Sequence, residues 1–300
     1  MVAWYEYKKK KNRRGRMKKI FWLSLLAMLI VLSACSSNQA SKEQEPDDAT
    51  NEQKKDNAQE KENPEHAEDS ASDGHKKDDN QGEKEQEADP DPEYRVSDTW
   101  NIVPLDKETN DEVALITIDD APDKHAVEMA KTLKDLDVNA IFFVNGHFIE
   151  SDEGQEKLKE IHDMGFLIGN HTYTHPFLPD LSADEQEEEI VRVNDKVEEI
   201  IGERPKFFRA PNGANTDHTK QVAKDEGMTL MNWTYGYDWE PEYQTKEKIT
   251  DMMLNSEYLG NGANLLMHDR DWTAAALADI VEGLRDQGYE LIDPKLIETE

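Results

Sequence analysis

A stretch without a single large apolar side chain limits most strongly what this chain can fold into. Residues 36–93 contain no Val, Ile, Leu, Met, Phe, Tyr or Trp. Such a segment cannot bury enough apolar surface to offset the conformational entropy that folding removes, about 1–2 kcal/mol per residue. We therefore predict that residues 35–93 form a disordered acidic tether, and that any packed core lies outside it.

The segment before the tether is basic and ends in an apolar run. Residues 1–35 carry 9 basic side chains and 1 acidic side chain, and residues 20–34 are apolar except for two serines. This run of 15 residues is short for a membrane-spanning helix, which needs about 20. A basic region, a short apolar run and small residues before a cleavage point are typical of a secretory signal. We predict a signal peptide over residues 1–34, with Met17 as an alternative start.

Cys35 is the only cysteine, which excludes an intramolecular disulfide framework and any multi-cysteine metal site. It follows Leu32-Ser33-Ala34, and these four residues resemble a bacterial lipobox, in which the cysteine is lipidated and becomes the mature N-terminus. The alternative is an incidental cysteine at the end of an uncleaved anchor. The lipobox predicts an extracytoplasmic lipoprotein, anchored to the membrane through Cys35.

The negative charge of the chain limits the class of macromolecule that it can bind. The chain has 35 Lys and Arg against 66 Asp and Glu, and residues 94–300 alone carry 19 and 45. A nucleic-acid interface needs clustered Lys and Arg to neutralise phosphates. We expect no nucleic-acid partner, and we expect a monomer.

Residues 94–300 alternate short apolar runs with amphipathic segments. We expect strands at 113–118, 140–144, 166–168, 206–208, 228–231, 264–267 and 289–292. We expect helices at 124–136, 153–164, 217–226, 246–255, 273–287 and from Ser182 onward, where Ser182 and Glu185 form a capping box. This alternation predicts an α/β fold with a parallel sheet, either open or closed into a barrel.

Polar residues follow five of the expected strands, where parallel α/β folds collect their functional groups. They are Asp119 with Asp120, His171 with His175, Arg209, the segment 235–239, and His268. Two histidines four residues apart can face one side of a helical turn and, with a carboxylate, bind Zn²⁺ or a similar ion. Adjacent carboxylates repel each other unless a cation or an arginine compensates.

These residues resemble the motifs of the polysaccharide deacetylases, carbohydrate esterase family 4. Thr117-Ile118-Asp119-Asp120-Ala121-Pro122 is similar to the first motif, and residues 171–175 to the second, H-[ST]-x-x-H. Residues 209–213 are similar to the third motif, R-x-P-x-G, residues 235–239 to the fourth, which ends in Asp-Trp, and residues 266–268 to the fifth, L-x-H. All five occur in the family's order.

The resemblance implies a distorted, incomplete (β/α) barrel and a divalent metal cofactor, with Zn²⁺ expected and Co²⁺ or Mn²⁺ as alternatives. It makes Asp120, His171 and His175 the metal ligands. It makes Asp119 the general base, paired with Arg209, and His268 the general acid. Asn212 would donate a backbone N–H to the oxyanion, and Trp239 and Asp238 would contribute to the substrate site.

Three residues depart from the family pattern. Ala121 replaces a usual glycine, and Asn212 replaces a common aromatic residue. Tyr235 stands where the fourth motif usually has its first aspartate, so Asp238 or Asp269 is left to tune the acid histidine. Among the other aromatic residues, Trp233 and Trp272 could line a sugar groove or pack in the core.

The implied activity is metal-dependent removal of N-acetyl groups from a polysaccharide. The extracytoplasmic location favours peptidoglycan GlcNAc or MurNAc, with chitin-like oligomers next. Two alternatives are an O-acetyl esterase of the xylan type and a family member that binds glycan with little turnover.

Overall fold

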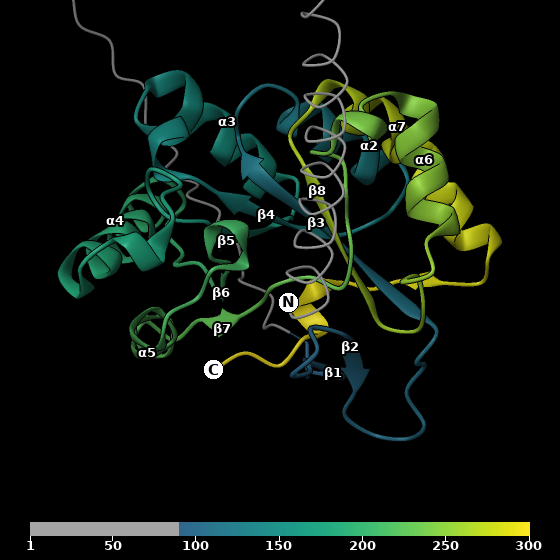
Figure 1. Cartoon of the computed structure of the whole chain (residues 1–300), viewed down its shortest axis with the longest axis horizontal. Coiled ribbons are helices and arrows are strands. Elements are labelled where there is room, and N and C mark those ends of the chain that lie inside the picture. The colour runs from purple at the N-terminus through teal and green to yellow at the C-terminus, as the bar shows by residue number, and fades with distance from the viewer. Residues whose placement is uncertain (1–89) are drawn as a thin grey trace, which may run out of the picture. The chain divides into compact units, whose positions relative to one another are not determined.

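A curled sheet of seven parallel strands forms the centre of residues 90–300, the part of the chain that this computed structural model describes (Figure 1). The predicted signal peptide, Cys35 and all but the last four residues of the predicted tether lie outside the described residues. The strands follow the order β7-β6-β5-β4-β3-β8, and β9 pairs with β3. They are β3 (Val113–Ala121), β4 (Ala140–Val144), β5 (Leu167–Asn170), β6 (Phe207–Phe208), β7 (Thr229–Leu230), β8 (Ala263–His268) and β9 (Glu290–Leu291).

Strand β3 lies between β4 and β8, and its apolar residues are covered on both faces of the sheet. Residues 113–118 are buried throughout, as expected for a run of apolar and β-branched residues in a parallel sheet. Ile116 pairs with Ala140 of β4 on one side and with Leu265 of β8 on the other. The strand continues to Ala121, three residues beyond the predicted end. Asp119 and Asp120, which we predicted to follow the strand directly, therefore lie on the strand itself.

Within residues 90–300, six α-helices lie on the outside of the sheet, with α3 and α4 on one side of Figure 1 and α2, α6 and α7 on the other. The capping box at the start of α4 is confirmed, because Ser182 Oγ accepts the backbone N–H of Glu185 and the Glu185 carboxylate accepts that of Ser182. The helices are α2 (Ala126–Asp135), α3 (Asp152–Asp163), α4 (Ala183–Ile201), α5 (Asp217–Asp225), α6 (Lys246–Asn255) and α7 (Asp271–Asp286).

The sheet curls nearly into a barrel but does not close regularly. Beyond β7, one isolated parallel bridge joins Tyr235 to Leu265 of β8, and the Thr234 N–H donates to the Asn264 carbonyl oxygen at 2.9 Å. This arrangement confirms the predicted distorted, incomplete (β/α) barrel. Within residues 90–300, no helix is long and apolar enough to cross a bilayer.

A short antiparallel hairpin, which the sequence analysis did not predict, covers the amino-terminal end of the barrel. It consists of β1 (Tyr94–Val96) and β2 (Ile102–Pro104). Tyr94 and Ile102 are buried in a cluster with the inner residues of β3 and β4. Tyr94 also forms a bridge with Ile297, so the hairpin joins the end of the chain to this face of the barrel (Figure 1).

Candidate functional site

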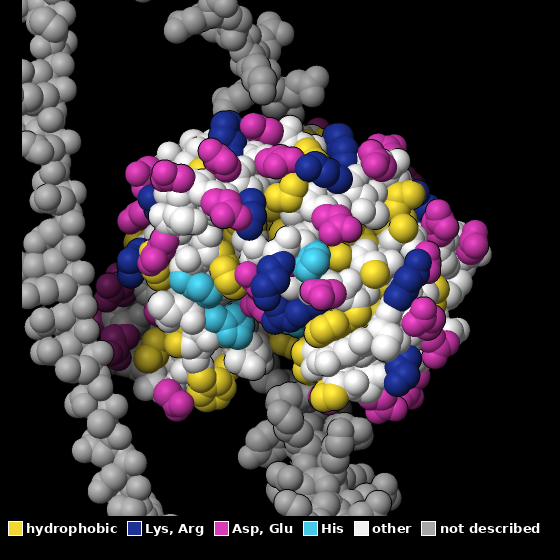
Figure 2. All heavy atoms as spheres, turned by 90° about the horizontal axis from the view of Figure 1, so that it is seen from above, with side chains coloured by type: hydrophobic (Ala, Val, Ile, Leu, Met, Phe, Trp, Pro, Cys, Tyr) yellow, Lys and Arg dark blue, Asp and Glu magenta, His cyan; other side chains and the backbone are white. Residues whose placement is uncertain are grey.

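The carboxyl ends of the parallel strands place the predicted polar residues on one face of the barrel. Asp119 and Asp120 end β3, His171 directly follows β5, and His268 is the last residue of β8. Arg209 follows β6 and is completely buried. In the view from above, histidine side chains lie beside Lys and Arg side chains near the middle of the face, with acidic side chains around them (Figure 2).

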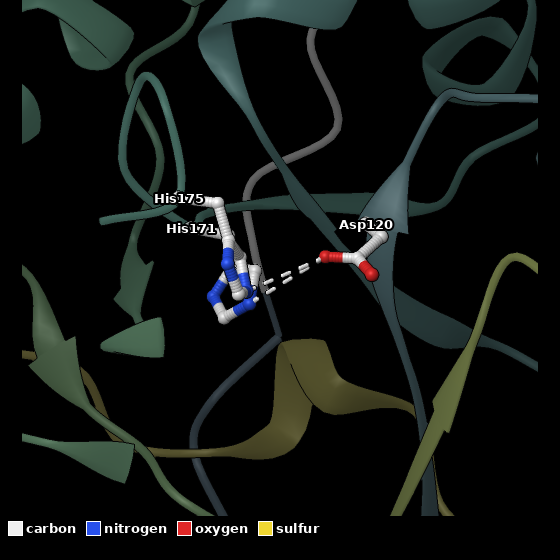
Figure 3. A group of neighbouring side chains, drawn as sticks. All are labelled: Asp120, His171 and His175. Carbon is white, nitrogen blue, oxygen red and sulfur yellow. Dashed lines mark ion pairs between the residues drawn. The ribbon is translucent and has the colours of Figure 1, made fainter. Parts of the chain in front are cut away.

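Asp120, His171 and His175 form a group with the geometry of a metal site (Figure 3). Their ligand atoms all lie within 4.8 Å of one another. Asp120 Oδ1 is 4.0 Å from Nε2 of His171 and 3.6 Å from Nε2 of His175. Ligand atoms that bind one tetrahedral Zn²⁺ at about 2.0–2.2 Å lie about 3.4 Å apart. A small contraction of this group would therefore accommodate such an ion.

The protonation of His171 suits a ligand. Its Nδ1 lies 2.7 Å from the backbone carbonyl oxygen of Arg209, which can only accept a hydrogen bond, so Nδ1 carries the proton and Nε2 keeps its lone pair. Burial lowers the pKa of His171 despite the opposing charges of Asp119 and Asp120, which keeps the imidazole neutral. Burial alone would raise the pKa of Asp120, but the nearby histidines and Arg270 lower it below its ordinary value, so the carboxylate is ionised.

The loop that carries the two histidines is irregular and does not form the helical turn that their spacing would allow. Thr172 and His175 adopt left-handed backbone conformations with φ of 67° and 59°, and the two imidazole rings lie 5.0 Å apart. The loop is held by polar residues that sequence analysis did not identify. Asn145 Nδ2 donates to the His171 carbonyl oxygen at 2.6 Å, and Glu189 accepts both the N–H and the hydroxyl of Thr174 at 2.7 Å.

Asp119 and Arg209 form a separate buried ion pair beside the group of Asp120, His171 and His175. Arg209 Nη1 donates to Asp119 Oδ1 at 2.6 Å. The other carboxylate oxygen of Asp119, Oδ2, lies 3.5 Å from Nε2 of His171. Each oxygen of this carboxylate therefore has its own neighbour, one a fixed guanidinium and the other a candidate metal ligand.

His268 is held by Asp238. The sequence left open whether Asp238 or Asp269 contacts this histidine, and the structure shows that Asp238 does. Asp238 Oδ1 lies 2.6 Å from Nδ1 of His268, and Asp238 Oδ2 accepts the backbone N–H of His268 at 2.7 Å. Asp269 instead accepts backbone N–H groups at the start of α2. Tyr235 is buried and donates its hydroxyl to the Met253 carbonyl oxygen, so it anchors α6.

The charge state of His268 follows from the Asp238 contact. Burial by itself would lower the pKa of the imidazole, but the carboxylate of Asp238, with smaller contributions from Asp119 and Asp120, raises it to about 9. Below that pH the ring is cationic. Because Nδ1 is engaged by Asp238, Nε2 is the nitrogen from which it can donate a proton.

Aromatic residues surround His268. The ring of Trp239 lies 5.5 Å from the imidazole, and Trp233 and Tyr237 lie 6.5 and 5.8 Å from Trp239. Trp272 donates its indole N–H to the Asp238 carbonyl oxygen at 2.8 Å, so it braces the loop that carries Asp238.

Asn212 lies in the short turn Pro211–Gly213 with a left-handed φ of 57°. The next residue, Gly213, has a left-handed φ of 62°, which favours glycine, and a Cβ there would lie only 3.1 Å from the Trp233 ring. The turn therefore packs against the aromatic residues and leaves Asn212 exposed.

Fold and site together define a parallel α/β barrel protein with a candidate metal centre at its strand ends. The family model described as "Polysaccharide deacetylase" matches residues 106–231. Two relatives from Bacillus subtilis are the peptidoglycan-N-acetylmuramic acid deacetylases PdaC and PdaA. PdaC is 32% identical over 204 residues, 66% of this chain, and PdaA is 30% identical over 200 residues, 64% of this chain. The chain belongs to the polysaccharide deacetylase family.

Solved structures agree with this assignment. A solved structure of PdaC from Bacillus subtilis has a TM-score of 0.55 and 32% identity, covering 61% of this chain and 88% of that one. A CE4 family pseudoenzyme from Bacillus anthracis has a TM-score of 0.56 and 28% identity, covering 60% and 63%. This chain spans 42% of the full length of PdaC and 74% of PdaA.

Proposed function

We propose that this protein hydrolyses N-acetyl groups on a cell-wall polysaccharide, with peptidoglycan GlcNAc or MurNAc as the substrate. The observation that carries the proposal is the placement of two independent proton-transfer groups, Asp119 and His268, beside the group formed by Asp120, His171 and His175. The relatives named as peptidoglycan deacetylases support the choice of substrate class.

Asp120, His171 and His175 would hold a divalent ion, and we propose Zn²⁺, with Co²⁺ or Mn²⁺ as alternatives. One carboxylate and two neutral imidazoles are a donor set that Zn²⁺ accepts readily. Such an ion supplies Lewis-acid chemistry, since it acidifies a bound water and polarises a carbonyl oxygen.

Asp119 would act as the general base. Arg209 holds one oxygen of its carboxylate at 2.6 Å, which leaves the other, next to His171, free to take a proton from the attacking water. A planar guanidinium is suited to this task because it fixes the direction of the carboxylate as well as its charge.

His268 would act as the general acid. An amide does not expel an amine anion, so the leaving nitrogen must receive a proton as the C–N bond breaks. The cationic ring can supply that proton from Nε2, and Asp238 stabilises the charged form before transfer. The backbone N–H of Asn212 would stabilise the oxyanion, and Trp239 would pack against the sugar near His268.

We also propose that the protein acts outside the cytoplasmic membrane, attached to it through a lipid on Cys35. The lipobox-like residues 32–35 support this location, as does a substrate that belongs to the cell wall. Metabolic labelling with a fatty acid would test it: the wild-type chain should carry the label, and a Cys35→Ser chain should not.

Acetate release is the direct test of the proposed activity. The purified full-length chain, supplied with Zn²⁺ or Co²⁺, should release acetate from peptidoglycan more readily than from chitin oligomers or acetylxylan. Asp119→Asn should slow release about 10²- to 10⁴-fold while the metal stays bound, because the proton acceptor is removed but none of the three proposed metal ligands is changed. Release from acetylxylan alone would favour the esterase alternative, and metal binding without any release would favour a non-catalytic glycan-binding protein.

Asp238→Asn should change the pH dependence of this reaction. The acid form of His268 is present below its pKa of about 9 and is lost above it. An opposite charge within 4–6 Å raises a histidine pKa by about 1–3, so the neutral amide should move the alkaline limb of the kcat profile from near pH 9 toward neutral pH. NMR titration of the His268 ring should report the same fall in pKa.

Asp279→Asn is the matched control for this prediction. Asp279 lies on the exposed surface of α7, where it pairs with Lys246 at 2.9 Å. The control should keep the wild-type alkaline limb. If the alkaline limb of the kcat profile did not move in Asp238→Asn, a group other than His268 would supply the proton.

A further inference from the structure

Arg270 contacts the candidate metal ligand Asp120 at the carboxylate oxygen that does not face the histidines. It directly precedes α7, and its Nη2 donates to Asp120 Oδ2 at 2.8 Å. The side chain of Asp120 is 15% exposed and that of Arg270 is 35% exposed. The two residues are 150 positions apart in the sequence, and Arg270 belongs to none of the motifs on which the sequence analysis depended.

The two oxygens of Asp120 therefore have different neighbours. Oδ1 faces Nε2 of both histidines, at 4.0 Å from His171 and 3.6 Å from His175, while Oδ2 binds Arg270. An aspartate side chain has only two rotatable bonds, so holding Oδ2 also fixes the position of Oδ1. The backbone of Asp120 has a left-handed φ of 62°, which is unfavourable for a residue other than glycine. The hydrogen bond from Arg270 therefore helps to hold this residue in place.

The turn that carries Arg270 is itself attached to the segment after β3. The carboxylate of Asp269, which is buried, accepts the backbone N–H groups of Lys124, His125 and Ala126 at 2.6–3.0 Å. On the other side of Arg270, Asp271 Oδ1 lies 2.8 Å from Nε2 of His125. Arg270 therefore extends from a backbone that is tied on both sides to the segment that follows the strand carrying Asp120.

We propose that Arg270 is a positioning residue that orients Asp120 for metal binding. The inference rests on the proposed function, since it takes Asp120, His171 and His175 as the ligands of a divalent ion. Partners of ligating residues usually raise metal affinity about 10- to 100-fold, because they hold the ligand in its binding orientation. The positive charge of Arg270 opposes a bound cation, but its partial exposure lets solvent screen that repulsion.

Metal affinity of the full-length chain is the test, measured for Zn²⁺ and Co²⁺ by competition with a chelator. Arg270→Ala should weaken binding about 10- to 100-fold. Arg270→Lys keeps a donor and a charge but loses the planar fork, so it should recover part of the lost affinity. The matched control is Arg285→Ala, because Arg285 lies in the last turn of the same helix and donates to the Leu136 carbonyl oxygen. It should bind metal as the wild type does.

The possible outcomes separate this role from the others. Unchanged or tighter metal binding in Arg270→Ala overturns the positioning role, as does a raised KM for an anionic glycan with wild-type metal affinity. A third outcome is that Arg270→Ala loses metal affinity and also lowers the unfolding midpoint of the metal-free chain, while Arg270→Lys restores neither. That outcome also overturns the positioning role, because the residue would then be structural. If the wild-type chain bound no metal at all, the proposed function would fail, which is a distinct result.

Discussion

Replacing His171 with alanine should remove most of the metal affinity of this protein and, with it, acetate release. Four-ligand structural zinc sites bind with about 10–16 kcal/mol, so each ligand carries on the order of 3 kcal/mol, or at least a hundredfold in affinity. His171 is the most buried of the three proposed ligands, and its tautomer is set by the Arg209 carbonyl oxygen. The candidate metal group consists of Asp120, His171 and His175, so no further member of that group can take the place of His171. Metal content after dialysis and acetate release measure the two effects.

His162→Ala is the matched control for this prediction. His162 lies on α3 with its side chain 26% exposed, and its Nε2 is 3.6 Å from a Glu203 oxygen. It should keep both metal and activity. Full metal occupancy in His171→Ala, with circular dichroism showing a folded chain, would rule out His171 as a ligand.

Replacing Arg209 with methionine should destabilise the fold by about 3–5 kcal/mol, because it leaves a buried charge without its partner. Asp119 is 2% exposed and cannot recover the lost interaction from water. The guanidinium also donates to the Thr117 hydroxyl at 2.8 Å and to the carbonyl oxygens of Met231 and Asn232 at 3.1 and 2.9 Å. One substitution therefore takes a hydrogen-bond donor away from several buried acceptors. Urea denaturation of the metal-free chain measures the change.

Two further variants show whether the ion pair is the cause. Arg204→Met removes a partly exposed arginine that binds Asp195, Glu198 and Glu226, and should cost about 1 kcal/mol or less. Combining Arg209→Met with Asp119→Asn should cost less than the sum of the single variants, because the isolated charge is then gone. A loss below 1 kcal/mol for Arg209→Met alone would contradict the buried-pair account.

Local patterns in the sequence predicted much of the architecture correctly. Short apolar runs identified the strands of the sheet, and the Ser182 capping box marked the start of α4. Both features depend on residues within a few positions of one another, so they can be recognised without the fold. The same applies to the spacing of His171 and His175, although the loop between them is not helical.

The partners of the site residues depend on how the sheet curls. Asp238 and Asp269 are both close to His268 in the predicted layout, but only Asp238 reaches its ring, across 30 positions of sequence. Asp269 instead binds the start of α2, and Arg270 reaches Asp120.

The sequence by itself predicted the parallel α/β class and the polar residue types at the strand ends. The tertiary structure decided which carboxylate holds His268 and brought Arg270 to Asp120 at the end of β3. The physical reason is that hydrogen bonds form only within about 3 Å, and the path of the loops after β7 and β8 sets those distances. No local periodicity encodes that path.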